Sequence, residues 1–196
     1  MHKHYGIYRS IRNNAWQCLL DFGIHSLPVD VRAIAHAADV RLIKNQVFPV
    51  LRRTDRGVTY YTPEHRIIIY DEALPPEEVR FTVAHELGHL FLGHDRTHER
   101  YAATRDTTKA LSEKQADQFA VRLLCPACLL MALDLHTPQQ IADVCRVPLR
   151  VAEERARRME TLYARNKFLT SSLEQRLYEE CKPYIERMQR AKGSST

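Results

Sequence analysis

The sequence predicts an α+β fold, in which a small three-stranded antiparallel sheet packs against helices and a helical extension follows at the C-terminus. Three observations favour this fold. Runs rich in β-branched and aromatic residues are concentrated in the first third of the chain, and apolar residues recur at helical spacing through most of the rest. The strands also precede most of the helices, which is typical of α+β proteins.

The N-terminal elements follow from local patterns. Apolar residues with a helical period alternate here with short β-branched runs. The predicted elements are helices at 8–22 and 31–38 and strands at 40–43, 57–62 and 66–70. The sequence Pro-Glu-His at 63–65 marks a turn, so we expect the last two strands to form a hairpin.

A longer helix is predicted from Pro76 to Gly93. Proline suits the first turn of a helix, and the carboxylates of Glu77 and Glu78 favour the positive end of the helix dipole. Apolar residues then recur with the spacing of a buried helix face, and Gly93 is a suitable stop. Gly88 lies inside this helix, where it would admit the close approach of another backbone.

This helix carries the motif HExxH at residues 85–89. Residues four apart project from the same face of a helix, so His85 and His89 can direct ring nitrogens at one metal ion. Glu86 lies one step around the helix, where it can contact a water molecule on that metal without being a ligand. Two histidines and a general base at this spacing are typical of zinc peptidases. The alternative is a core helix with two incidental histidines, because the motif also occurs by chance.

A catalytic zinc ion usually has three protein ligands, and the predicted helix at 112–124 supplies a candidate. Ser112 with Gln115 fits a capping box at the start of this helix. Glu113 and Asp117 lie four residues apart, beside an apolar stripe. In a metal site Glu113 is the third ligand, and Asp117 accepts the second N–H of a ligand histidine. The alternative is a solvated helix edge.

These residues together resemble the ImmA/IrrE family of metallopeptidases. The similarity is strongest in RFTVAHELGH at residues 80–89 and in the pattern E-x-x-A-D-x-F-A-x-x-L-L-x-P from Glu113 to Pro126. It extends upstream to Leu-Pro-Val-Asp at 27–30, and it covers residues 27–160.

The resemblance implies zincin-type, gluzincin-like active-site helices, with His85, His89 and Glu113 as metal ligands and Glu86 as the catalytic acid and base. It also implies the substrate class, because proteins of this family cleave a helix-turn-helix repressor of a mobile element or of a stress response. The predicted function is therefore zinc-dependent endoproteolysis of such a repressor, as a means of gene regulation.

The sequence leaves open which metal is bound and whether the protein cleaves its partner. Two histidines and a glutamate suit zinc best, and Mn²⁺ or Fe²⁺ can occupy similar ligand sets. The competing functional hypothesis is a metal-stabilised regulator that binds DNA or a protein without cleaving it.

The polar stretch at 94–109 lies between the two ligand helices, and we expect it to border the cleft. His94, His98 and Tyr101 are candidates for stabilising the oxyanion of a tetrahedral intermediate. The sequence does not choose among them.

Residues 137–155 have the rhythm of a helix-turn-helix unit: a capped helix, a turn at 146–148 and a second helix rich in arginine. Glu153 and Glu154 lie among those arginines and would repel phosphates. We therefore favour a helix pair that packs on the catalytic domain over direct DNA binding, which remains the second interpretation. A further amphipathic helix is predicted at 171–190.

The expected domain organisation has three parts. Residues 1–130 form a metallopeptidase domain that includes the N-terminal helices, residues 131–190 form the C-terminal helical region, and residues 191–196 form a disordered tail.

The composition is that of a globular protein, with 44% hydrophobic and 27% charged residues. No stretch approaches the ~20 apolar residues of a membrane span, and the N-terminus leads into no secretory signal, so we expect no membrane partner. Five cysteines without framework spacing predict reduced thiols in a cytoplasm. Cys125 and Cys128 form a lone CxxC, which we interpret as structural because a zinc site needs more ligands. The net charge of +5 is compatible with DNA or an acidic partner and proves neither.

Overall fold

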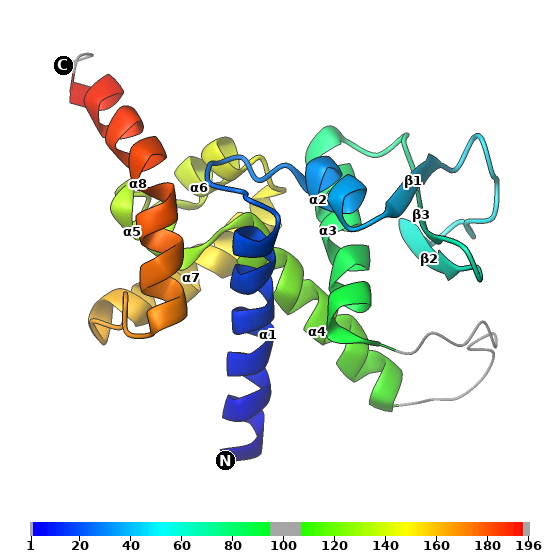
Figure 1. The fold of residues 1–196 in the computed structure, drawn as a ribbon, viewed down its shortest axis with the longest axis horizontal. Helices are drawn as coiled ribbons and strands as arrows, with labels where there is room; N and C mark the ends of the chain where they lie inside the picture. The colour runs from blue at the N-terminus through cyan, green and yellow to red at the C-terminus, as the bar shows by residue number, and fades with distance from the viewer. Residues whose placement is uncertain (1, 95–106, 194–196) are drawn as a thin grey trace. The chain divides into compact units, whose positions relative to one another are not determined.

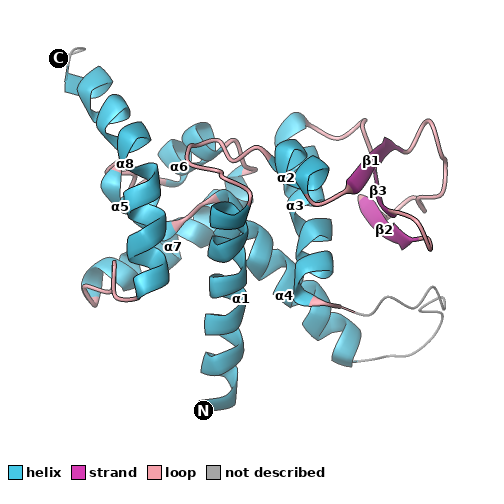
Figure 2. Ribbon diagram, in the orientation of Figure 1, coloured by secondary structure: helices cyan, strands magenta, loops and turns pink. Residues whose placement is uncertain are grey.

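The computed structural model describes residues 2–94 and 107–193, which form helices and one small sheet (Figures 1 and 2). The elements, in order, are α1 (His2–Asp21), α2 (Val31–Ala37), β1 (Val40–Lys44), β2 (Gly57–Tyr61), β3 (Arg66–Tyr70), α3 (Pro76–Leu92), α4 (Thr107–Leu124), α5 (Ala127–Ala132), α6 (Pro138–Cys145), α7 (Leu149–Ala164) and α8 (Ser172–Gly193). They divide into two compact units, the first comprising Met1–Asn14 and Asp30–Ala120 and the second Ala15–Val29 and Val121–Thr196.

The predicted α+β class is confirmed, but the expectation of an antiparallel sheet is wrong in one pairing. The strand order is β1-β3-β2; β2 pairs antiparallel with β3, and β1 pairs parallel with β3. The connection at residues 45–56 is long enough to pass β3 and reach its far side, which a tight hairpin turn could not do. β3 is therefore the central strand, and Ile68 and Ile69 in it are fully buried.

The predicted hairpin between β2 and β3 is confirmed. Thr62 N–H donates to the carbonyl of His65 at 2.8 Å, and the Thr62 hydroxyl accepts from His65 N–H at 2.8 Å. These bonds close the turn and pair Thr59 of β2 with Ile68 of β3. The turn thereby fixes which side chains of β2 face the same way.

Helix α3 has the boundaries that its sequence predicts. It begins at Pro76, with Glu77 and Glu78 in its first turn, and it ends at Leu92. Gly93 follows in the left-handed conformation with φ 68°, which glycine adopts without a Cβ penalty. Helix α3 packs against β2 and β3, so its motif residues lie beside the sheet.

The predicted start of the next helix is wrong. Helix α4 begins at Thr107, so Ser112 lies inside it and does not cap it. Five further helical residues precede Ser112, so the first turn of the helix, where a cap would act, lies upstream of it. The side chain of Gln115 instead bonds to His94.

The second unit is helical throughout its described residues. Its core includes Trp16 and Leu19 from α1 and buried residues of α5 to α8. Helix α6 begins with a capping box between Thr137 and Gln140, as the sequence predicts, and Pro126 separates α4 from α5. All five cysteines are buried, and none of them forms a disulfide bond.

Helix α8 continues to Gly193, three residues into the tail that we expected to be disordered. The Lys192 ammonium donates to the carbonyl of Leu133 at 2.6 Å. The positive charges of Arg190 and Lys192 also interact favourably with the negative, C-terminal end of the helix dipole. These interactions stabilise the last turn. Among the described helices, none combines the length and apolar character that a membrane span requires.

Candidate metal centre

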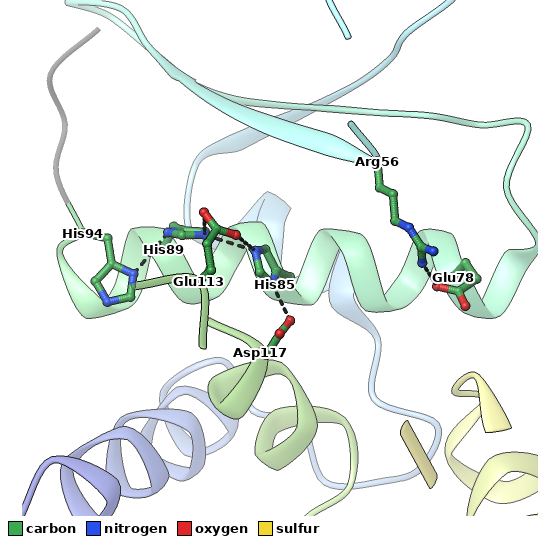
Figure 3. A network of polar contacts seen from close by, with 7 residues as sticks. All are labelled: Arg56, Glu78, His85, His89, His94, Glu113 and Asp117. Atoms are coloured by element: carbon green, nitrogen blue, oxygen red, sulfur yellow. Dashed lines mark hydrogen bonds and ion pairs between the residues drawn. The ribbon is translucent and has the colours of Figure 1, made fainter. Parts of the chain in front are cut away.

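Three side chains converge on one point beside the sheet. His85 and His89 project from the same face of α3, and Glu113 reaches them from α4 (Figure 3). The Nε2 atoms of His85 and His89 are 3.0 Å apart. Glu113 Oε2 lies 3.3 Å from His85 Nε2, and Glu113 Oε1 lies 3.7 Å from His89 Nε2. Within the described part of the chain, these three residues form the one cluster of three potential metal ligands.

The distances suit a small divalent cation. Ligand atoms held about 2.0–2.1 Å from a tetrahedral zinc ion lie roughly 3.4 Å from one another. The two nitrogens are 3.0 Å apart, and each lies 3.3 or 3.7 Å from a different oxygen of Glu113, distances close to that value. Two imidazoles and a carboxylate are also the donor set of many catalytic zinc sites. The residues present therefore fit a zinc ion.

The close approach of α3 and α4 depends on Gly88. A Cβ atom at this position would lie 3.1 Å from the carbonyl oxygen of Ala116 and 3.2 Å from its Cα. The expected close packing at this glycine is thereby confirmed. Glu113 lies one turn before Ala116 in α4, so the same packing brings its carboxylate to the histidines.

Asp117 contacts Nδ1 of His85, the ring nitrogen that does not face the other two converging side chains. His85 Nδ1–H donates to Asp117 Oδ1 at 2.8 Å, so when the ring is neutral its lone pair is on Nε2, which faces Glu113 and His89. Burial lowers the pKa of His85, but the hydrogen bonds to Asp117 and Glu113 outweigh it and raise that pKa to about 10. When the rings of His85 and His89 are protonated, their hydrogen bonds to Glu113 hold the pKa of that carboxyl well below its usual value.

Glu86 is hydrogen-bonded to strand β2 and is not one of the three converging side chains. Its side chain is buried, with 8% exposed, and the Thr59 hydroxyl donates to Oε2 at 2.6 Å. Burial raises the pKa of Glu86, although the Thr59 bond and the nearby histidines oppose the rise. Thr59 is a contact that sequence reasoning missed, because only the sheet register shows which residue of β2 faces α3.

Glu86 is further held by the fit of β2 against α3. A Cβ atom at Gly57 would lie 2.6 Å from Thr82 Cγ2 and 3.4 Å from Glu86 Cγ. The start of β2 therefore reaches the helix only because it carries no side chain at this position. Beside it, the exposed Arg56 guanidinium donates to Glu78 Oε2 at 2.5 Å and joins this end of the strand to the first turn of α3 (Figure 3).

His94 lies on the other side of His89. Its Nδ1 is 3.1 Å from His89 Nδ1, and its Nε2 is 2.9 Å from Gln115 Oε1. Burial lowers the pKa of His94. Both ring nitrogens are thus engaged with protein groups, and the oxyanion role considered from the sequence stays a prediction. The other two candidates, His98 and Tyr101, lie outside the described residues.

A signal for the His94 contact was present in the sequence. His94 N–H bonds to the carbonyl of His89 at 3.0 Å, and Gly93 N–H bonds to that of Leu90 at 3.3 Å. These two bonds form a Schellman motif, which folds the second residue past a helix back onto the last turn. A histidine four residues before a terminal glycine and another directly after it, as in His89 and His94 around Gly93, therefore predict a contact between the two rings.

Comparison with known proteins agrees with this site. Residues 43–157, more than half of the chain, match the family described as the IrrE N-terminal-like domain, Peptidase M78. The chain is also similar to the radiation response metalloprotease IrrE of Deinococcus deserti, with 37% identity over an alignment of 75 residues that covers 36% of this chain. The match spans 26% of that relative, about a quarter of its length.

A fold with this small mixed sheet and an HExxH helix beside it defines a metallopeptidase-like protein, and the family match is specific. The chain belongs to the IrrE N-terminal-like family, which is classed among the peptidases. The family resemblance drawn from the motifs is thereby confirmed.

Proposed function

We propose that this protein is a zinc-dependent endopeptidase in which His85, His89 and Glu113 hold the metal and Glu86 is the catalytic base. The convergence of the three ligand atoms within 4.8 Å of one another, next to a buried carboxylate, is the observation that carries this proposal. The family membership and the metalloprotease name of the similar protein support it.

The metal would supply Lewis acidity, which acidifies water and polarises a peptide carbonyl. Asp117 holds His85 in the tautomer that presents Nε2 to the site. Glu86 accepts the proton of the attacking water through the carboxylate that Thr59 orients, and then donates this proton to the leaving amine. The raised pKa of Glu86 suits the first task, because a stronger base takes the proton more readily.

We propose a helix-turn-helix repressor as the substrate. This rests on the resemblance to the ImmA/IrrE family, whose members act on such proteins. The cleaved chain would be a separate polypeptide, and repressor loss would release the genes that it silences.

The test is incubation of the helix-turn-helix protein encoded beside this gene with wild-type or Glu86→Gln protein, with Zn²⁺ or Mn²⁺, followed by intact mass. We expect one metal-dependent cut, made only by the wild type. Glu86→Gln should keep the wild-type metal content, because Glu86 lies outside the ligand cluster. Undiminished turnover by this variant would remove Glu86 from the mechanism, and a stable uncut complex would favour a binding regulator.

The DNA-binding hypothesis has a separate test. The exposed positions of α7 carry both signs of charge, with Arg150 and Arg157 beside Glu153 and Glu154, whereas Arg155 is 4% exposed. Mixed charge weakens attraction to a phosphate backbone, so we expect no specific duplex binding. Salt-dependent binding that disappears in an Arg150→Ala, Arg157→Ala double variant would support the regulator instead.

A further inference from the structure

The two histidines of the motif have different outer partners. The Nδ1 atom of His85 bonds to a carboxylate, that of Asp117, whereas the Nδ1 atom of His89 meets a second imidazole, that of His94 (Figure 3). The rings of His89 and His94 are 5.1 Å apart between centroids and nearly perpendicular, at 72°. A ring nitrogen of one therefore lies beside a ring nitrogen of the other.

The hydrogen bonds of His94 assign the protons along this chain of contacts. The Gln115 Oε1 atom is an acceptor, so the facing Nε2 of His94 carries a hydrogen. In a neutral imidazole the other nitrogen then has the lone pair, and His94 Nδ1 accepts from His89 Nδ1–H. The remaining nitrogen of His89, Nε2, is left with its lone pair, and it is the atom that faces His85 Nε2 and Glu113.

We propose that His94 and Gln115 are positioning residues that fix the tautomer and the ring orientation of His89 for metal binding. This inference rests on the proposed metal site. The Gln115 carboxamide sets the tautomer of His94, and His94 in turn sets that of His89. The backbone supports the arrangement, because the left-handed Gly93 returns His94 to the last turn of α3, and Gln115 lies two residues after Glu113 on α4.

Helix α4 contributes to the site in more than one way. Helix α4 supplies Glu113 to the metal position, Asp117 to His85 and Gln115 to His94. One helix thus contributes a ligand, the outer contact of His85 and the residue that contacts His94 behind His89. A partner that acts through another residue is expected to affect metal affinity about 10- to 100-fold when it is lost.

The experiment compares zinc dissociation constants, measured by competition with a chelator, for the wild type and for His94→Phe, Gln115→Leu and Gln115→Glu. Phenylalanine keeps the ring but has no acceptor, and leucine at position 115 removes the acceptor for His94. We expect zinc binding weaker by about 10- to 100-fold in both. Gln115→Glu keeps the acceptor and should remain close to the wild type. The matched control is Lys114→Leu, an exposed change on the same helix, which should leave zinc binding unchanged.

Two readouts separate positioning from a general structural role. The melting temperatures of the metal-free variants report folding, and they should fall far less than zinc affinity does. The visible absorption of the Co²⁺-substituted protein reports ligand geometry, and it should change in His94→Phe and Gln115→Leu but not in Gln115→Glu.

The positioning role, the acceptor role of Gln115 and the metal site itself are each tested by a different outcome. Wild-type zinc affinity in both His94→Phe and Gln115→Leu would overturn the inference while leaving the metal site intact. A Gln115→Glu variant as weak as Gln115→Leu would overturn the acceptor role of Gln115. Zinc binding that is absent in the wild type, or that survives His85→Ala unchanged, would instead overturn the metal site itself.

Discussion

The backbone of Ala116 occupies the space in which a side chain at Gly88 would begin. A Cβ at position 88 would lie 3.1 Å from the Ala116 carbonyl oxygen, closer than ordinary van der Waals contact. The two ligand helices therefore meet backbone to backbone, and the distance between them sets where Glu113 stands relative to His85 and His89.

Gly88→Ala should separate the helices. The methyl group meets backbone atoms and the ring of Phe119 at 3.2 Å, and backbone atoms cannot move aside cheaply. We expect a loss of about 1–3 kcal/mol in the free energy of unfolding, reduced by the ~1 kcal/mol that alanine gains over glycine in a helix. Zinc affinity should fall as well, because Glu113 moves with α4. Chemical denaturation and chelator competition measure the two effects.

Gly6→Ala is the matched control for this prediction. Gly6 is also a helical glycine, in α1, and a Cβ there meets nothing within 4 Å. We expect this change to be neutral or to stabilise by up to about 1 kcal/mol. Equal effects at both positions would contradict the close-packing explanation.

Thr59→Val should impair catalysis without affecting the metal. Valine keeps the β-branched shape but cannot donate to Glu86, and a hydrogen bond to a charged group is worth about 1.5–3 kcal/mol, or roughly 10- to 100-fold in rate. Zinc affinity should stay within about twofold, because the hydroxyl of Thr59 bonds to Glu86, which is outside the ligand cluster, whereas loss of a partner that holds a ligand costs 10-fold or more. Thr59→Ser keeps the hydroxyl and should retain most of the activity. A Thr59→Val protein with wild-type kcat would contradict this role.

The pH profile gives a second check on Thr59. Glu86 must be ionised to accept a proton, and the Thr59 bond lowers its pKa by stabilising the carboxylate. Removing that bond raises the pKa, so the acidic limb of kcat/KM should move to higher pH in Thr59→Val. A limb that stays in place, or moves to lower pH, would show that another group controls it.

Zinc should stabilise the fold through the three ligands. Free zinc at 100 times its dissociation constant adds about 2.7 kcal/mol to the free energy of unfolding, provided that the unfolded chain does not bind it. We expect His85→Ala, His89→Ala and Glu113→Ala to abolish this shift, and Asp117→Asn to weaken binding by about 10- to 100-fold. Thermal melts with and without zinc, together with metal content, test this order. Metal content that ignores all four changes would refute the site.

The cysteines should resist alkylation in the folded protein. Burial, with the nearby Asp21 charge, raises the pKa of Cys18 to about 12, and burial with Glu180 raises that of Cys181 to about 11. A raised pKa favours the unreactive thiol, so the reaction should be slow at pH 8 and should accelerate as the pH rises toward these values. Mass spectrometry after iodoacetamide treatment should find little modification before unfolding and all five thiols modified after it.

The sequence predicted those parts of the site that depend on local spacing. The ends of α3 were predictable because Pro76 favours a helix start and Gly93 favours a helix end. His85 and His89 lie on one face because of the helical period alone. Glu113 required a second motif, because its distance from the histidines is set by the packing of two helices.

Other contacts depend on structure that local patterns do not contain. The parallel pairing of β1 with β3 follows from a long connection whose path the sequence does not specify. The contact of Thr59 with Glu86 follows from sheet register, and that of His94 with Gln115 joins residues far apart along the chain. The predicted cap at Ser112 was wrong because a helix signal upstream extends through it.

The turn between Thr62 and His65 has a consequence for reactivity. A one-residue slip of β2 against β3 would send the Thr59 hydroxyl to the opposite face of the sheet, and a side chain would replace the bare backbone of Gly57 against α3. An insertion in this short surface turn would therefore uncouple the carboxylate of Glu86 from its hydroxyl while leaving every ligand residue unchanged. The length of a hairpin loop is in this sense a determinant of base strength at a site to which the loop contributes no atom.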